Sequence, residues 1–202
     1  VQLAYEADRL AGLRAVKLRA YGTRVDHWMT DAWRTSAAGT PRGYSMGTRA
    51  KTESLGAKAE GSLGRLAVGV EWTRQGWDGS TEMAGMQYRP QASIPDVVTT
   101  TVGAYAEHAR SVGQRSSLSL GVRLDRASSE ADAAKANLRL FQAYHGSSAG
   151  SVTNWLPSGK LRLTARHTTG LEVALGVGHT ERVPEASERY FGLDEVGTRM
   201  WT

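Results

Sequence analysis

Apolar side chains recur at every second position over much of this chain. Between residues 118 and 125, the even positions are apolar and the odd positions are small or charged. The same alternation appears over residues 66–73, 160–166 and 171–178. Because successive side chains in a β-strand point to opposite faces, each stretch predicts a strand with one apolar face and one polar or small face.

The apolar faces are mostly aliphatic, and the opposite faces carry glycine, serine, threonine and charged residues. A soluble β-sandwich of this length needs large aromatic side chains to fill its core, but the chain has only 2 phenylalanines. A surface that faces lipid has no such core to fill. The pattern therefore favours strands that cross a membrane.

The connections between the strands alternate in length. The expected strands lie near residues 1–8, 13–29, 47–61, 65–77, 96–110, 116–127, 152–167 and 171–180. The first, third, fifth and seventh connections are tight turns, and the others are long and polar. Short periplasmic turns that alternate with long extracellular loops are typical of bacterial outer-membrane barrels. The predicted fold class is all-β, an antiparallel up-and-down transmembrane β-barrel segment of about eight strands.

Two further features fit this arrangement. Trp28, Trp72, Trp77 and Trp155 lie near strand ends beside long loops, where an interfacial aromatic girdle is expected. Residues Ala131–Tyr144 include Ala, Lys and Leu, which favour helix, and we expect a short helix there within the third long loop.

Composition and missing motifs exclude several classes of protein. The mean hydropathy of −0.40, with no run of ~18 apolar residues, excludes transmembrane helices. The net charge of +5 does not indicate a nucleic-acid partner, because the basic residues are spread along the strands rather than clustered. The chain has no cysteine, nucleophile elbow or phosphate-binding glycine loop, so we expect neither an enzyme nor a bound cofactor.

One pair of side chains stands out near the end of the second expected strand. Counting by twos from Lys17 and Arg19, His27 and Met29 fall on the charged face and Trp28 falls on the apolar face. An imidazole and a thioether two residues apart can reach one ion, and this soft pair suits copper, especially Cu(I). Two ligands do not complete a site, and the same spacing also occurs in strands that bind no metal.

Two segments carry a family resemblance. Residues 176–191 resemble a stretch of TonB-dependent receptor barrels in which a G-x-G/S-x-x-x-R-x-P strand precedes an acidic and an aromatic residue; Arg182, Pro184, Glu188 and Tyr190 match. Residues 25–31 are similar to the Val-Asp-His-x-Met-Asp-Asn stretch of TonB-dependent copper receptors, with Thr and Asp at its last two positions. Residues 93–97 also resemble that subfamily.

The resemblance implies a protein of the bacterial outer membrane that imports copper by gated transport. TonB would act on a plug domain, and His27 and Met29 would be metal ligands beside a cysteine and a methionine of that plug. Because no plug-like segment is present, residues 1–202 are expected to be a fragment of the barrel domain, without the plug and the remaining strands. The expected partners are outer-membrane lipid, TonB through the plug, and a metal or metal complex.

Alternatives remain open at this point. A siderophore-type receptor of the same family and a passive porin both fit the charged positions Arg123, Lys160 and Arg162 on the expected lumenal face. Outer-membrane transporters close with ~22 strands, so about eight strands predict a partial, open barrel wall rather than a closed small barrel.

Overall fold

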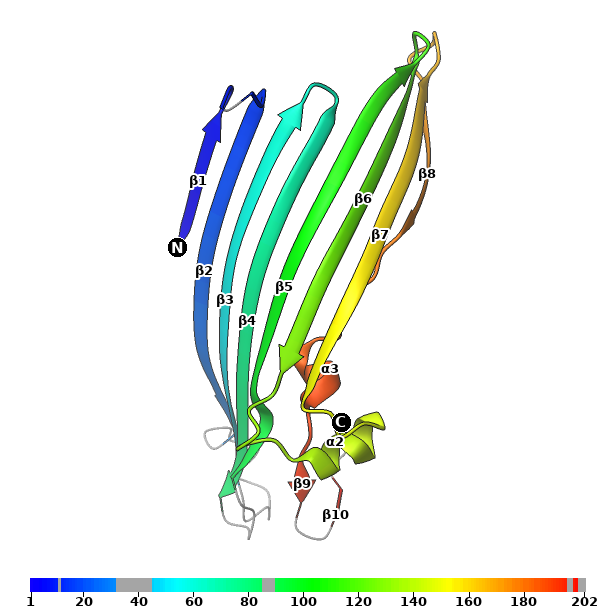
Figure 1. Ribbon diagram of the computed structural model, residues 1–202. Coiled ribbons are helices and arrows are strands. Elements are labelled where there is room, and N and C mark those ends of the chain that lie inside the picture. The colour runs from blue at the N-terminus through cyan, green and yellow to red at the C-terminus, as the bar shows by residue number, and fades with distance from the viewer. Residues whose placement is uncertain (11, 32–44, 85–89, 196–197, 200–202) are drawn as a thin grey trace.

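Eight antiparallel strands form one open sheet in chain order, each hydrogen-bonded to the next (Figure 1). The computed structural model describes all residues except 11, 32–44, 85–89, 196–197 and 200–202. The strands are β1 (Gln2–Ala7), β2 (Ala15–Thr30), β3 (Ser45–Leu63), β4 (Leu66–Ala84), β5 (Gln91–Val112), β6 (Ser116–Glu130), β7 (Ser151–Arg166) and β8 (Glu172–His179). The predicted antiparallel, open wall is confirmed, since β1 and β8 lie at opposite edges and do not pair.

Shorter elements complete the described chain. They are the helices α2 (Leu138–His145) and α3 (Ala186–Tyr190) and the two-residue strands β9 (Asp194–Glu195) and β10 (Thr198–Arg199). No helix in the described part of the chain has the length and apolarity needed to cross a membrane.

The tight turns all lie at one end of the sheet (Figure 1). Gly12, Gly64, Gly113 and Gly170 occupy these turns with φ between 64° and 86°, a region that favours glycine because it has no Cβ. The connections at the other end differ in length, and residues 131–150 include α2. We call the two ends the turn end and the loop end.

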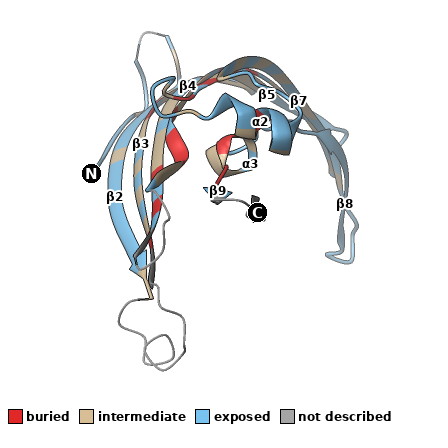
Figure 2. Cartoon of the chain, turned by 90° about the horizontal axis from the view of Figure 1, so that it is seen from below, coloured by how far each residue is buried: buried red, intermediate tan, exposed pale blue. Residues whose placement is uncertain are grey.

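The sheet is curved, and α2 and α3 lie on its concave side (Figure 2). Tyr190 of α3 packs in one cluster with Val97 of β5, which places the odd-numbered positions of the following part of β5 on the concave face. The convex face carries a band of exposed apolar side chains. They include Leu18, Val70, Trp72, Val102, Val122, Leu124, Leu161 and Leu175. The alternation predicted from the sequence is thus a division between the two faces of a curved wall.

Strands β4 and β5 extend further toward the loop end than the sequence predicts. Their pairing continues through register shifts at Trp77, Gly79 and Ser80, so that Gly79 pairs with Ile94. Next to this irregularity, Asp96 has a φ of 44°. The glycine and polar residues interrupt the alternation without ending the strands, so β4 runs to Ala84 and β5 begins at Gln91, within the predicted second long loop.

A small core lies on the concave side at the loop end. Ile94, Val97, Ala131, Phe141 and Tyr190 are its buried members, and Trp77 packs against them. The placement of Trp77 in a lipid-facing girdle was therefore wrong: it pairs with Val97 and faces inward. Trp28, Trp72 and Trp155 lie on the convex face, as predicted, and are 38–61% exposed. The predicted place of Trp72 near a strand end was wrong, because β4 continues to Ala84.

The predicted helix in the third connection is shorter than expected. It occupies Leu138–His145, and the Asn137 side chain accepts a hydrogen bond from the backbone N–H of Leu140. The preceding residues instead follow the wall, where the Asp132 N–H donates to the Pro95 carbonyl over 2.9 Å. This tertiary contact outweighs the helix propensity of the alanines at the start of the predicted helix.

Candidate functional site

A network of charged side chains covers the middle of the concave wall, and Tyr105 of β5 lies at its centre. The Tyr105 hydroxyl donates a hydrogen bond to Glu60 of β3. The Lys58 ammonium lies 5.0 Å and the Arg123 guanidinium carbon 6.0 Å from the centre of the Tyr105 ring. Both distances suit a cation–π interaction, so β3, β5 and β6 are joined by side chains as well as by the backbone.

Arg123 of β6 makes the densest contacts of this network. Its Nε and Nη2 atoms each donate to Asp125 over 2.7 Å, and its Nη1 donates to Glu71 of β4 over 2.9 Å. The fork geometry of a guanidinium matches a carboxylate on two atoms, which fixes direction as well as charge. The Arg123 side chain is therefore held in one position across three strands.

Glycines on the concave face make room for these long side chains. A Cβ at Gly69 would lie 2.4 Å from the Tyr105 ring, and one at Gly103 would lie 1.9 Å from an Asp125 carboxylate oxygen. On β6, a Cβ at Gly121 would lie 2.7 Å from the Lys160 side chain, which itself pairs with Glu107 over 2.5 Å. Sequence reasoning missed this arrangement, because it depends on which residue lies across from each glycine in the neighbouring strand.

The network borders an open groove of about 580 Å³. Its charged and aromatic lining includes Lys58, Glu60, Tyr105, Arg123, Lys160 and His179. The concave position predicted for Arg123 and Lys160 is thus confirmed by their contacts. Arg123 and Lys160 each have a carboxylate partner, so their side chains are held in position along the groove.

His27 and Met29 lie nearer the loop end, on the same concave face. The β2–β3 register is unbroken from Ala15 to Thr30, with His27 opposite Ala50 and Met29 opposite Thr48. Both side chains are exposed, and the Thr48 hydroxyl lies 3.4 Å from that of Thr81 on β4. The described residues include no group of three or more histidine and acidic side chains placed to hold a metal ion. The structure therefore puts the pair on one accessible face without supplying further ligands of these types.

The segment after β8 leaves the sheet and returns to the concave wall. Arg182 donates to both carboxylate oxygens of Glu188, from Nη1 over 2.6 Å and from Nη2 over 2.7 Å. The Glu185 backbone N–H donates to the same carboxylate over 2.8 Å at the start of α3. The Tyr190 hydroxyl then donates to the Ser129 carbonyl over 3.3 Å. The contacts of Glu188 hold the segment together, the Tyr190 hydrogen bond attaches it to β6, and the Gly192 N–H attaches it to β5 by donating to the Ser93 carbonyl over 3.1 Å.

Comparison with known proteins identifies the family. The family of TonB-dependent receptor-like β-barrels matches residues 1–199. This chain belongs to that family. It is a transporter family rather than an enzyme family, and its members lie in the bacterial outer membrane, as the sequence predicted.

A solved structure of the copper transporter OprC superposes with a TM-score of 0.70 at 22% sequence identity. The match covers 93% of this chain and 30% of the OprC chain. At this identity the likeness bears on the fold. No curated protein matches the sequence. In this TonB-dependent receptor barrel wall, the convex face contacts lipid, the concave face lines the lumen, and the loop end faces outward.

The Arg182–Glu188 pair should make docking of the segment after β8 depend on pH. The guanidinium of Arg182, followed by the Glu185 N–H, lowers the pKa of Glu188 from 4.5 to about 2. Because the pKa of Glu188 is lower in the docked segment than in the unfolded chain, the ionised carboxylate stabilises the docked state. This stabilisation is complete above the unfolded pKa and is lost as the pH falls through the folded pKa. We expect protection of α3 to decline between about pH 4.5 and pH 2.

Hydrogen–deuterium exchange over residues 182–190, corrected for intrinsic exchange rates, measures this decline. The matched control is Glu188→Gln, which cannot titrate and should show weaker protection with a flat pH profile. Identical profiles for the two proteins would contradict the assignment.

Proposed function

We propose that this chain forms part of the wall of an outer-membrane receptor that imports copper by TonB-energised, gated transport. His27 and Met29 act as two ligands of the transported ion. The observation that carries the proposal is their shared position on the lumenal face, near the outer end of β2 and exposed to the lumen. The resemblance of residues 25–31 to the copper-receptor pattern adds to it, as does the fold shared with the copper transporter OprC.

The wall's own residues position the ion rather than transform it. An imidazole nitrogen and a thioether sulfur are soft donors that favour Cu(I) over the hard cations magnesium and calcium. Continuous pairing of β2 with β3 holds the two donors at a constant spacing along the strand. In the proposed receptor, a plug domain outside residues 1–202 supplies the remaining ligands and blocks the lumen, and TonB acts on that plug to release the ion.

Removing either donor should weaken copper binding. For the full-length receptor, we expect His27→Ala and Met29→Ala each to raise the Cu(I) dissociation constant at least about tenfold, because each removes one soft donor from the coordination sphere. Competition with a chromophoric Cu(I) chelator measures this constant under reducing conditions.

A histidine outside the lumen provides the control. His108 of β5 pairs with Leu66 on the convex face, and His108→Ala should leave the constant unchanged. Unchanged binding in both His27→Ala and Met29→Ala would refute the ligand assignment.

A siderophore-type receptor is the second candidate, and it shares the energised mechanism. It is favoured by the charged groove around Tyr105 and Arg123, which offers more polar contacts than a bare ion uses. A passive porin fits less well, because the segment that carries α3 lies across the lumenal wall instead of leaving it open (Figure 2). Uptake assays with free copper and with iron–siderophore complexes, with and without TonB, discriminate the three.

A further inference from the structure

The convex face carries a group of charged side chains that neither transport nor the lumenal network uses. Its members are Arg24 and Asp26 on β2, Arg49, Lys51 and Glu53 on β3, and Arg74 on β4. We name these six residues the outer basic patch. The β2–β3 register pairs Arg24 with Glu53 and Asp26 with Lys51, and the β3–β4 register pairs Leu55 with Arg74. All six therefore lie on the convex, lipid-facing side.

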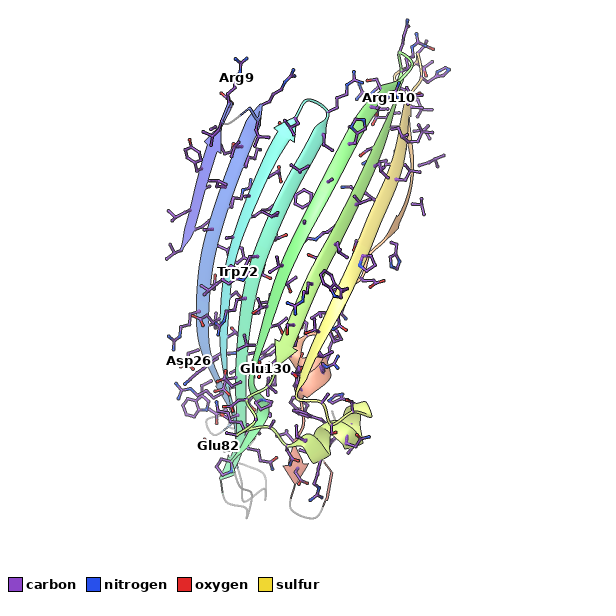
Figure 3. The ribbon with its side chains drawn as sticks, in the orientation of Figure 1. Arg9, Asp26, Trp72, Glu82, Arg110 and Glu130 are labelled. Carbon is purple, nitrogen blue, oxygen red and sulfur yellow. The ribbon has the colours of Figure 1, made fainter. Side chains whose placement is uncertain are left out.

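The patch begins where the apolar band of these strands ends. Toward the turn end, the convex positions of the same three strands are Leu18 and Ala20, Ala57 and Ala59, and Val70 and Trp72. In Figure 3, Asp26 lies closer to the loop end than Trp72 does. Because the loop end faces outward, this order places the patch on the outer-leaflet side of the apolar band.

Positive charge is in excess within this patch. It holds four cations and two carboxylates. Asp26 accepts two hydrogen bonds from Arg49, over 2.7 and 3.0 Å, and Glu53 lies 3.5 Å from Arg74. Within the described part of the chain, Arg24 and Lys51 have no carboxylate within 4.0 Å. They are diagonal neighbours across β2 and β3, which puts their Cβ atoms within about 8 Å of each other.

The excess positive charge of the outer basic patch suits an anionic lipid of the outer leaflet. Basic side chains that cluster at headgroup height recognise anionic lipid headgroups, and arginine binds phosphate through two parallel hydrogen bonds. Trp28 lies on the same face opposite Arg49, on the loop-end side of Arg24 and Lys51, and is 55% exposed. We propose that the outer basic patch binds the phosphate groups of a phosphorylated glycolipid of the outer leaflet, with Arg24 and Lys51 as its main contacts.

The test uses the full-length receptor in detergent, titrated with bis-phosphorylated lipid A and followed by native mass spectrometry. For Arg24→Gln/Lys51→Gln we expect the dissociation constant for lipid A to rise at least about tenfold, because two charge-assisted contacts are lost. The charge-retaining pair Arg24→Lys/Lys51→Arg should bind within about threefold of the wild type. Loss of binding in that pair, or full retention in the glutamine pair, would overturn the proposal.

Two further arms separate this site from simpler explanations. Lys17→Gln/Arg19→Gln makes the same change of charge on the concave face of β2 and should leave lipid A binding unchanged; an equal loss there would mean attraction by net charge alone. Inorganic phosphate and dephosphorylated lipid A serve as the other probes. If inorganic phosphate bound as tightly as lipid A through the same residues, the patch would be a site for free anions and the lipid assignment would be wrong.

Discussion

Tyr190→Ala is expected to detach residues 186–193 from the lumenal wall. Tyr190 is 1% exposed, and its ring packs edge-on against Phe141 with the ring centres 5.5 Å apart. Removing a large buried aromatic side chain costs about 3–5 kcal/mol, because it deletes packing and leaves a cavity. Since α3 has 5 residues and Tyr190 is its buried side chain, we expect the docked state of this helix to be lost while the sheet remains paired.

Hydrogen–deuterium exchange in the full-length receptor locates this effect. Protection should fall over residues 186–193 and over α2, which contributes Phe141, and stay unchanged in β2 and β3. Tyr190→Phe is the matched variant: it keeps the ring and loses only the hydrogen bond to Ser129, worth about 1 kcal/mol. If the alanine and phenylalanine variants behaved alike, packing of the ring would not be what attaches the segment.

Arg123→Met should destabilise the sheet through the carboxylates it leaves behind. Asp125, with a side chain 11% exposed, and Glu71 would lose their cation, and an uncompensated buried charge is costly. Because the Arg123 side chain is 34% exposed, water offsets part of this cost, and we expect a loss of about 2 kcal/mol in the free energy of unfolding.

Urea unfolding in lipid vesicles, followed by tryptophan fluorescence, measures this loss. Arg162→Met provides the control, because among the described residues Arg162 has no carboxylate within 4.0 Å. The double variant Arg123→Met/Asp125→Asn should recover part of the loss, since it removes the buried charge along with its partner. Equal destabilisation by the Arg123 and Arg162 variants would show that the fork contacts contribute nothing specific.

The strand pattern was predictable because alternation is a local property. The alternation over residues 118–124 predicts two faces without reference to the neighbouring strands. The tight turns are predicted by short segments that contain Gly12, Gly64, Gly113 and Gly170. The concave position of His27 and Met29 followed from the same counting, because no bulge interrupts the pairing of β2 with β3.

The prediction for Trp77 failed for a reason that is not local. Its position near a strand end fits an aromatic girdle, but girdle tryptophans face lipid, and the face of Trp77 is set by its pairing with Val97. What makes the inward position favourable is the cluster of Phe141 and Tyr190, which come from two distant connections. Neither partner is visible from the sequence around Trp77.

Local sequence thus determined the two-faced strands, their order and the ends to which the turns and loops belong, because each depends on a few consecutive residues. Tertiary structure decided how the strands align with one another. Only that alignment puts Tyr105 over Gly69, Arg123 between Asp125 and Glu71, and Arg24 diagonal to Lys51. Apart from the contact between Arg123 and Asp125, these contacts join residues far apart in the chain, which come together only once pairing across the sheet has set the register.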